Sequence, residues 1–134
     1  MGMYKYMKDA FQKSYKEKDE ALKKRVRAWR KDGAAVRIEK PTNLARAREL
    51  GYKAKKEIVM SRVKILKGAR RRKRPDLGRK PGRQHKLKNP GQTQEKIAMR
   101  KAQARFPNCT MLNAYYVGHD GQYAYYEVIM QATN

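Results

Sequence analysis

Cysteine and long apolar runs are scarce in this sequence of 134 residues. Its one cysteine, Cys109, rules out an internal disulfide and any CxxC zinc or redox motif. Apolar runs such as 114–117 end after about four residues, whereas a transmembrane helix needs about twenty. Residues 1–13 hold no apolar stretch of the length found in secretory signals. We therefore expect an intracellular protein that does not enter a membrane.

Acidic residues are also few. Only 12 Asp and Glu oppose 35 Lys and Arg, so the formal net charge is +23 and the pI is about 10.4. At a mean hydropathy of −1.06, apolar burial barely offsets chain entropy and self-repulsion. The 40% of apolar residues still allow one small core. This balance predicts a single domain that needs a polyanionic partner.

The charge is concentrated in the middle of the chain. Composition divides the domain into basic N-terminal helices (1–33), a β-α-β unit (34–66), an extended basic loop (67–90) and an α-β-β core (91–134). Segment 67–90 carries eleven cations and one acid, whereas 91–134 is nearly neutral and holds six of the twelve aromatic residues. We therefore expect the core at the C-terminal end and the contact surface elsewhere.

Apolar spacing predicts the elements of each segment. The predicted helices are one through Tyr4, Met7, Phe11 and Tyr15; one through Leu22, Val26 and Trp29, capped by Asp19 and ended by Gly33; Asn43–Leu50, capped by Thr42 and closed by a left-handed Gly51; and Gln94–Arg105. The predicted strands are Ala35–Glu39, Ile58–Leu66, Thr110–Val117 and Gln122–Met130, the last two joined by a turn at 118–121.

The basic loop carries the strongest chemical signal. Five consecutive cations can neutralise phosphates and release their counterions, while interleaved Gly and Pro let the backbone follow a folded nucleic acid. Without a partner we expect this loop to be disordered. The alternatives to nucleic-acid contact are a solvated charge run, a nuclear-import signal or a flexible linker. The candidate contacts in it are Arg70, Arg71, Arg72, Lys73, Arg74, Arg79, Lys80, Arg83, His85, Lys86 and Lys88.

Further candidate contacts lie outside this loop. The cations among them are Lys23, Lys24, Arg27, Arg30, Arg46, Arg48, Lys53, Lys55, Lys56, Arg62 and Lys64. Tyr4, Tyr6, Tyr15, Trp29 and Tyr52 lie among cations and could stack on unpaired bases. Packing is the preferred interpretation for most of them, and Tyr52 is the one we favour as a contact.

Catalysis finds little support in the sequence. His85 and His119 belong to no catalytic or metal-binding motif, and no phosphate-cradling glycine loop occurs. Asp120 is predicted to be a turn residue, and Glu127 a strand residue that faces solvent or RNA. We expect no catalytic site, no metal site, no cofactor and no small-molecule substrate.

Short motifs occur in a characteristic order along almost the whole chain. They are Met1–Gly2, Tyr4–Tyr6, Arg27, Trp29–Arg30, Val36–Thr42, Arg46–Arg48, Leu50–Lys55, Arg72–Pro75, Gly78–Pro81, Phe106–Asn108, Leu112–Asn113, Tyr116–Gly118, Asp120–Gly121 and Glu127–Ile129. Together they resemble the archaeal and eukaryotic fifteen-e family of large-subunit ribosomal proteins, in an archaeal-like form. That family continues with a basic C-terminal tail where this sequence ends, so contacts made by the tail are expected to be absent or supplied otherwise.

The resemblance implies a structural role and a fold. Family members are α+β proteins with a small antiparallel sheet flanked by helices and an extended basic loop that penetrates RNA. The resemblance implies a cytoplasmic ribosome as the location, with large-subunit rRNA and neighbouring ribosomal proteins as partners. It maps the RNA contacts to Tyr52–Lys55 and Arg70–Lys88. The rival hypotheses are a non-ribosomal protein that compacts nucleic acid and an RNA-modifying enzyme.

Overall fold

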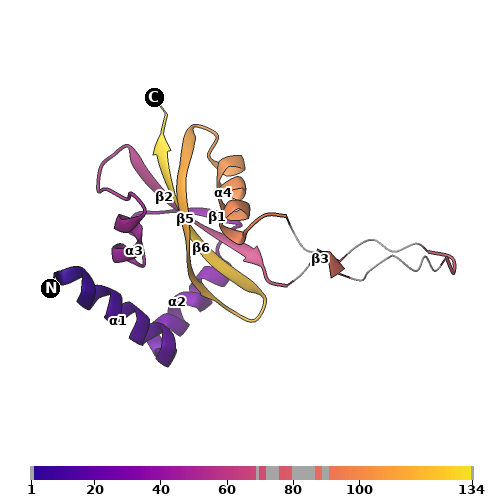
Figure 1. Ribbon diagram of the computed structural model, residues 1–134, viewed down its shortest axis with the longest axis horizontal. Coiled ribbons are helices and arrows are strands. Elements are labelled where there is room, and N and C mark those ends of the chain that lie inside the picture. Colours follow the sequence, from indigo (N-terminus) through magenta and orange to yellow (C-terminus); the bar gives the residue numbers. More distant parts are fainter. Residues whose placement is uncertain (1, 69, 72–75, 80–86, 89–90, 134) are drawn as a thin grey trace.

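The molecule is built around two groups of strands (Figure 1). The computed structural model describes residues 2–68, 70–71, 76–79, 87–88 and 91–133. The elements in chain order are α1 (Met3–Glu17), α2 (Glu20–Lys31), β1 (Ala35–Ile38), α3 (Leu44–Glu49), β2 (Ile58–Leu66), β3 (Arg70–Arg71), β4 (Leu87–Lys88), α4 (Gln94–Arg105), β5 (Cys109–His119) and β6 (Tyr123–Ala132). Four strands form an antiparallel sheet in the order β1-β2-β6-β5, and β3 pairs with β4. The predicted α+β fold, an antiparallel sheet flanked by helices, is confirmed.

Helices cover both faces of the sheet (Figure 1). On one face, Ala98 and Ala102 of α4 are fully buried against Val63, Val128 and Met130. Alanine at these positions lets the helix approach the strands closely.

The opposite face is covered by the other helices. Trp29 of α2 and Ala47 of α3 pack with Met60, Tyr125 and Ile129, and α1 adds a partly buried side chain to the same cluster. The prediction of a core at the C-terminal end is therefore too narrow. Strand β6 is central and buried on both faces, so the C-terminal segment supplies the middle of the core and the earlier segments close it.

Most predicted helix ends are close, but one cap was assigned to the wrong residue. Asn43, not Thr42, is the N-cap of α3, because its side chain accepts a hydrogen bond from the backbone N–H of Arg46 at 3.1 Å. Thr42 instead contacts Glu127 in the sheet. Helix α2 ends at Lys31 with Asp32 as its C-cap, one residue before the predicted Gly33, whereas Gly51 has the expected positive φ of 100°.

The hairpin between β5 and β6 also differs from the prediction. Gly118 lies within β5 and not in the turn, and the register shifts between Tyr116 and Gly118. The turn is instead built by Asp120, whose Oδ1 accepts hydrogen bonds from the N–H groups of Gln122 and Tyr123 at 2.7 and 2.6 Å. At the turn β5 therefore extends to His119, beyond the predicted Val117, whereas β6 begins at Tyr123, one residue later than predicted.

Part of the basic loop is ordered into a short ladder. Arg70 pairs with Lys88 and Arg71 with Leu87. The prediction that the whole segment is disordered without a partner is therefore wrong for these four residues. The ladder and the exposed residues 76–79 lie away from the sheet in Figure 1. Residues 69, 72–75, 80–86 and 89–90 of the loop lie outside the described ranges, and the disorder predicted for them stays a prediction.

Candidate nucleic-acid interface

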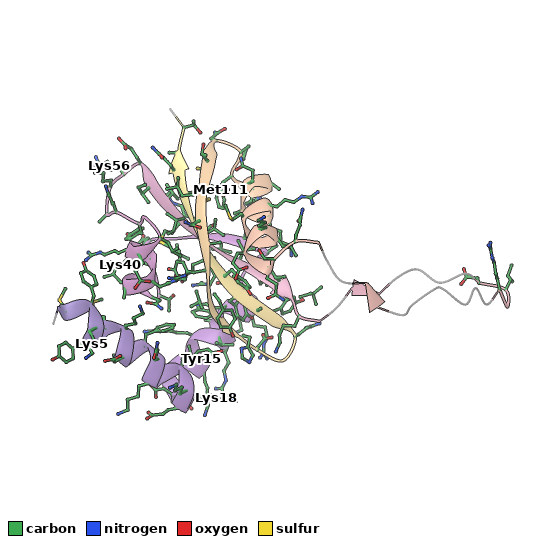
Figure 2. The ribbon with its side chains drawn as sticks, viewed as in Figure 1. Lys5, Tyr15, Lys18, Lys40, Lys56 and Met111 are labelled. Carbon is green, nitrogen blue, oxygen red and sulfur yellow. The ribbon has the colours of Figure 1, made fainter. Side chains whose placement is uncertain are left out.

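A short turn after α3 presents three lysines to solvent. Gly51 reverses the chain, and the N–H of Tyr52 bonds to the carbonyl of Ala47 at 2.9 Å. Two further backbone bonds, from Lys55 to Lys53 and from Ile58 to Lys55, shape the turn at 2.9 and 3.1 Å. Its exposed cations, which form no ion pair or side-chain hydrogen bond with any described residue, are Lys53, Lys55 and Lys56. Figure 2 shows Lys56 at the outer end of this turn.

The predicted stacking residue at this turn is only partly available. Tyr52 is half-buried and packs against the cluster that contains Met60 and Tyr115. By contrast, Tyr4 and Tyr6 on α1 are 44% and 69% exposed, although packing was the preferred interpretation for most aromatic candidates. Trp29 is buried as a core residue. Sequence spacing alone did not show which side of α1 lacks a neighbour.

Helix α2 carries a second group of predicted contacts. Lys23, Lys24 and Arg27 are exposed, and the nearest acid to Lys23 is Glu20 at 3.8 Å. Arg30 is also exposed, but its Nε donates to Oδ2 of Asp120 at 3.2 Å. This part of the helix therefore combines cations open to a ligand with one that fastens it to the hairpin turn.

Arg46 and Arg48 on α3 take part in a junction with α1. Nη1 of Arg46 lies 2.9 Å from Glu49, which also receives Lys8 Nζ of α1 at 2.8 Å. Hydrogen bonds from Lys8 and then Arg46 hold the pKa of Glu49 below its usual value. Arg48 donates to the hydroxyl of Tyr4, and its guanidinium lies 5.4 Å from the centre of that ring. Both arginines keep an exposed side while they position α1.

Arg62 and Lys64 of β2 are engaged within the fold. Arg62 Nη2 donates to Asp32 at 2.7 Å, and its guanidinium lies 4.7 Å from the centre of the Trp29 ring. Lys64 Nζ donates to the carbonyl oxygens of Arg30 and Asp32 at 3.3 and 2.5 Å. Both cations thus lie at the C-terminal end of α2, where the helix dipole favours positive charge.

The described ranges contain few of the predicted loop contacts. Arg79 is exposed at the loop tip beside Leu77 and Gly78, which both have positive φ. Arg70, Arg71 and Lys88 lie on the β3–β4 ladder. The candidates outside the described ranges are Arg72, Lys73, Arg74, Lys80, Arg83, His85 and Lys86.

Glu127 does not face solvent or RNA, as the sequence had suggested. Its side chain is fully buried and accepts hydrogen bonds from the N–H and hydroxyl of Thr42, at 3.0 and 2.5 Å, and from the hydroxyl of Tyr115. Burial, followed by the charge of Glu127, raises the pKa of Tyr115 well above its usual range. The carboxylate therefore fixes the segment that leads into α3 and its basic turn.

Asp120 is a turn residue, as predicted, and a second buried anchor. Burial would raise its pKa, but bonds from the Tyr123 N–H, the Tyr125 hydroxyl, the Gln122 N–H and Arg30 together lower the pKa to about 2. Burial and the hydrogen bond to Asp120 raise the pKa of the Tyr125 hydroxyl to about 12. The carboxylate stays charged at neutral pH and ties α2 to the hairpin.

Neither a membrane span nor a metal cluster is found in the residues that the structure describes. The helices formed by those residues are too short or too polar to cross a bilayer. No group of three or more His, Cys, Asp or Glu side chains in the same residues is placed to hold a metal ion. What the described surface does offer is exposed lysine and arginine on rigid turns and helices, which defines the class of small basic proteins that bind nucleic acid.

Comparison with known proteins identifies the family. A family model described as Ribosomal L15 matches residues 2–133, so the chain belongs to that family. The curated large ribosomal subunit protein eL15 of Methanocorpusculum labreanum is 44% identical over 135 residues, which cover 99% of this chain and 70% of the relative. The resemblance predicted from the ordered motifs is confirmed. The family is one of ribosomal proteins and not a class of enzymes.

Proposed function

We propose that this chain is a structural constituent of the large ribosomal subunit in the cytoplasm, where it binds and stabilises folded rRNA as one domain. Membership of the Ribosomal L15 family supports this role. The structural observation that carries it is the turn after α3, where Lys53, Lys55 and Lys56 are exposed and form no ion pair with any acid in the described part of the chain. Three cations held on one short turn favour phosphate groups that are equally close together.

The mechanism is charge neutralisation on a rigid platform. The sheet and its helices hold the cations at fixed spacing, so RNA strands that repel each other can approach across the protein surface. The contacts we propose on the described surface are Lys23, Lys24, Arg27, Arg30, Arg46, Arg48, Tyr52, Lys53, Lys55, Lys56 and Arg79. Arg62 and Lys64 are left out because their charged groups already contact α2. Within the subunit, neighbouring ribosomal proteins are secondary partners, and no step of catalysis is assigned.

The basic loop extends the proposed surface. Its predicted cations from Arg70 to Lys88 are expected to neutralise further phosphates, as the family resemblance implies. The β3–β4 pairing supports this arrangement because it brings the two ends of the loop together away from the sheet (Figure 1). A loop anchored in this way can enter a space between RNA helices that the wider body cannot.

The salt dependence of rRNA binding tests this function. The variant K53A/K55A/K56A is compared with K96A/R100A/R105A, which removes three exposed cations from α4. Each lost phosphate contact lowers the slope of log affinity against log salt by about 0.9, so the first variant is expected to lose about 2 to 3 units. Equal slopes for the two variants would contradict the assigned surface. Duplex DNA that competes as well as rRNA at matched salt would instead favour the nucleic-acid-compacting alternative.

A further inference from the structure

A cavity lies between the α1–α2 corner and the β5–β6 turn, separate from the lysine turn after α3. Its volume is about 620 Å³, within the range of small-ligand pockets. Tyr15 and Lys18 border it from the corner, where Figure 2 shows both side chains, while Leu22 and Val26 of α2 form an apolar wall. His119 borders it from the hairpin. The space is thus a solvent-open recess between two elements that Asp120 and Arg30 hold together.

The charge around this cavity is strongly positive. The cations that line it are Lys16, Lys18, Lys23, Arg27, Arg30 and Lys67. Asp120 is the acid in the lining, and its carboxylate already accepts hydrogen bonds from Arg30, Tyr125 and two backbone N–H groups. Lys23 has an exposed acid, Glu20, at 3.8 Å. The remaining positive charge favours an anionic ligand.

Tyr15 and His119 add aromatic rings with polar groups to the lining, and Tyr116, which does not itself line the cavity, contacts both rings. Tyr15 and Tyr116 meet edge to face, 6.0 Å between ring centres, with their hydroxyls 2.9 Å apart. The Tyr116 hydroxyl also bonds to Nδ1 of His119, which leaves Nε2 of that ring for a ligand. Apolar side chains, an aromatic edge and one ring nitrogen match the surface of a planar heterocycle better than that of a plain phosphate.

We infer that this cavity takes one unpaired nucleotide of RNA, with its base between the Leu22–Val26 wall and the Tyr15–His119 rings. Its flanking phosphates contact Lys18, Lys23 and Arg27. A base within a duplex cannot enter such a recess, so the ligand is a nucleotide turned out of its helix or in a single-stranded loop. This inference rests on the proposed rRNA-binding function and adds a nucleotide pocket to its cationic surface.

Ultraviolet cross-linking of the full chain to large-subunit rRNA tests the pocket, with nucleotide adducts mapped on peptides by mass spectrometry. Wild-type protein is expected to carry adducts on Tyr15 or His119. Leu22→Trp fills the cavity and keeps every cation, and it should reduce these adducts at least about tenfold, since stacking contributes about 1–3 kcal/mol per base. Its matched control is Leu112→Trp on β5, where the same bulk lies outside the cavity.

A charge-reversal pair covers the case in which the tryptophan variant does not fold. Arg27→Glu changes an exposed lining residue, and Arg100→Glu makes the same change on α4. Only the first is expected to remove the adducts. Circular dichroism confirms that each variant tested is folded.

Four outcomes distinguish the explanations. Loss of adducts in Leu22→Trp or Arg27→Glu, but not in the controls, supports the pocket. Wild-type protein that binds rRNA without adducts at Tyr15 or His119, or with adducts equal in all variants, overturns the pocket and leaves the proposed function standing. Wild-type protein that does not bind rRNA removes both. A lysine cross-linker that joins Lys18 or Lys23 to a protein segment in assembled subunits overturns the pocket in favour of an acidic peptide.

Discussion

The backbone N–H of Thr42 donates a hydrogen bond to the buried carboxylate of Glu127 across 85 positions of the chain, at 3.0 Å. Glu127→Gln keeps the size of the side chain but replaces one acceptor oxygen with an amide donor. We expect this variant to lose about 2–4 kcal/mol of unfolding free energy, because the remaining amide oxygen cannot accept from both hydroxyls and the NH2 group then faces a donor of Thr42 or Tyr115. Urea unfolding at neutral pH measures it. Glu57→Gln, at an exposed acid, should change stability by less than about 0.5 kcal/mol.

Asp120 predicts a defined acid sensitivity. Its folded-state pKa of about 2 lies below the ordinary value of 3.8, so the unfolded chain binds the proton more readily. The stabilisation is therefore present above about pH 4 and is lost as the pH falls toward 2. Asp120→Asn should reduce stability at neutral pH by about 2 kcal/mol and flatten the change between pH 4 and 2. Thermal melting across this range tests it, and a wild-type slope in the variant would contradict the assignment. Exposed Asp9→Asn is the control.

Arg62 separates a structural role from an RNA contact. Arg62→Lys keeps the charge but loses the planar group over Trp29, and it should cost about 1 kcal/mol of stability. Arg62→Ala should cost more, because Asp32 also loses its partner. The slope of rRNA affinity against salt should stay within error of wild type for both. A slope reduced by about one unit would show that Arg62 contacts phosphate. Arg37→Lys on β1 is the matched exposed control.

Gly51 controls the shape of the lysine turn. Its φ of 100° is strained for any residue with a Cβ, although nothing lies within 4 Å of the place where that atom would be. Gly51→Ala should therefore destabilise the protein by about 1–2 kcal/mol through backbone strain alone. Chemical denaturation measures the loss, and rRNA affinity should fall with it as the turn shifts. Gly91→Ala, at an exposed glycine without a positive φ, should cause neither change.

Local pattern was sufficient for elements whose ends are marked in the sequence. The bounds of β2 and α4 are those predicted. Alternating apolar and polar residues define β2, and Pro107 just beyond α4 prevents that helix from continuing. The hairpin turn was misplaced because glycine was taken as a turn signal. In the structure Gly118 lies in a strand, where a Cβ would come within 3.6 Å of Trp29. That distance is an ordinary van der Waals contact, so neither a positive φ nor a lack of space requires glycine at this strand position.

Side-chain roles depended on distant segments. Arg62 and Lys64 of β2 were predicted as RNA contacts, but the sequence could not show that the C-terminal end of α2 engages both cations. Glu127 was misjudged for the same reason, since its partner Thr42 comes from another segment. The exposed lysines after α3 were predicted from local sequence, because a short turn closed by Gly51 leaves few places for long cationic side chains to be buried.

The central position of β6 sets an order of events during protein synthesis. Every other described strand precedes β6 in the chain, yet β2 and β5 meet only through it. A ribosome adds about 5–20 residues per second, so the cationic earlier segments leave the exit tunnel seconds before the sheet can close. During that interval the nascent polypeptide has charge but no completed hydrophobic centre. Folding of the sheet is thus delayed until β6 has left the exit tunnel, and the cationic segments that emerge earlier are exposed to cellular polyanions before the sheet closes.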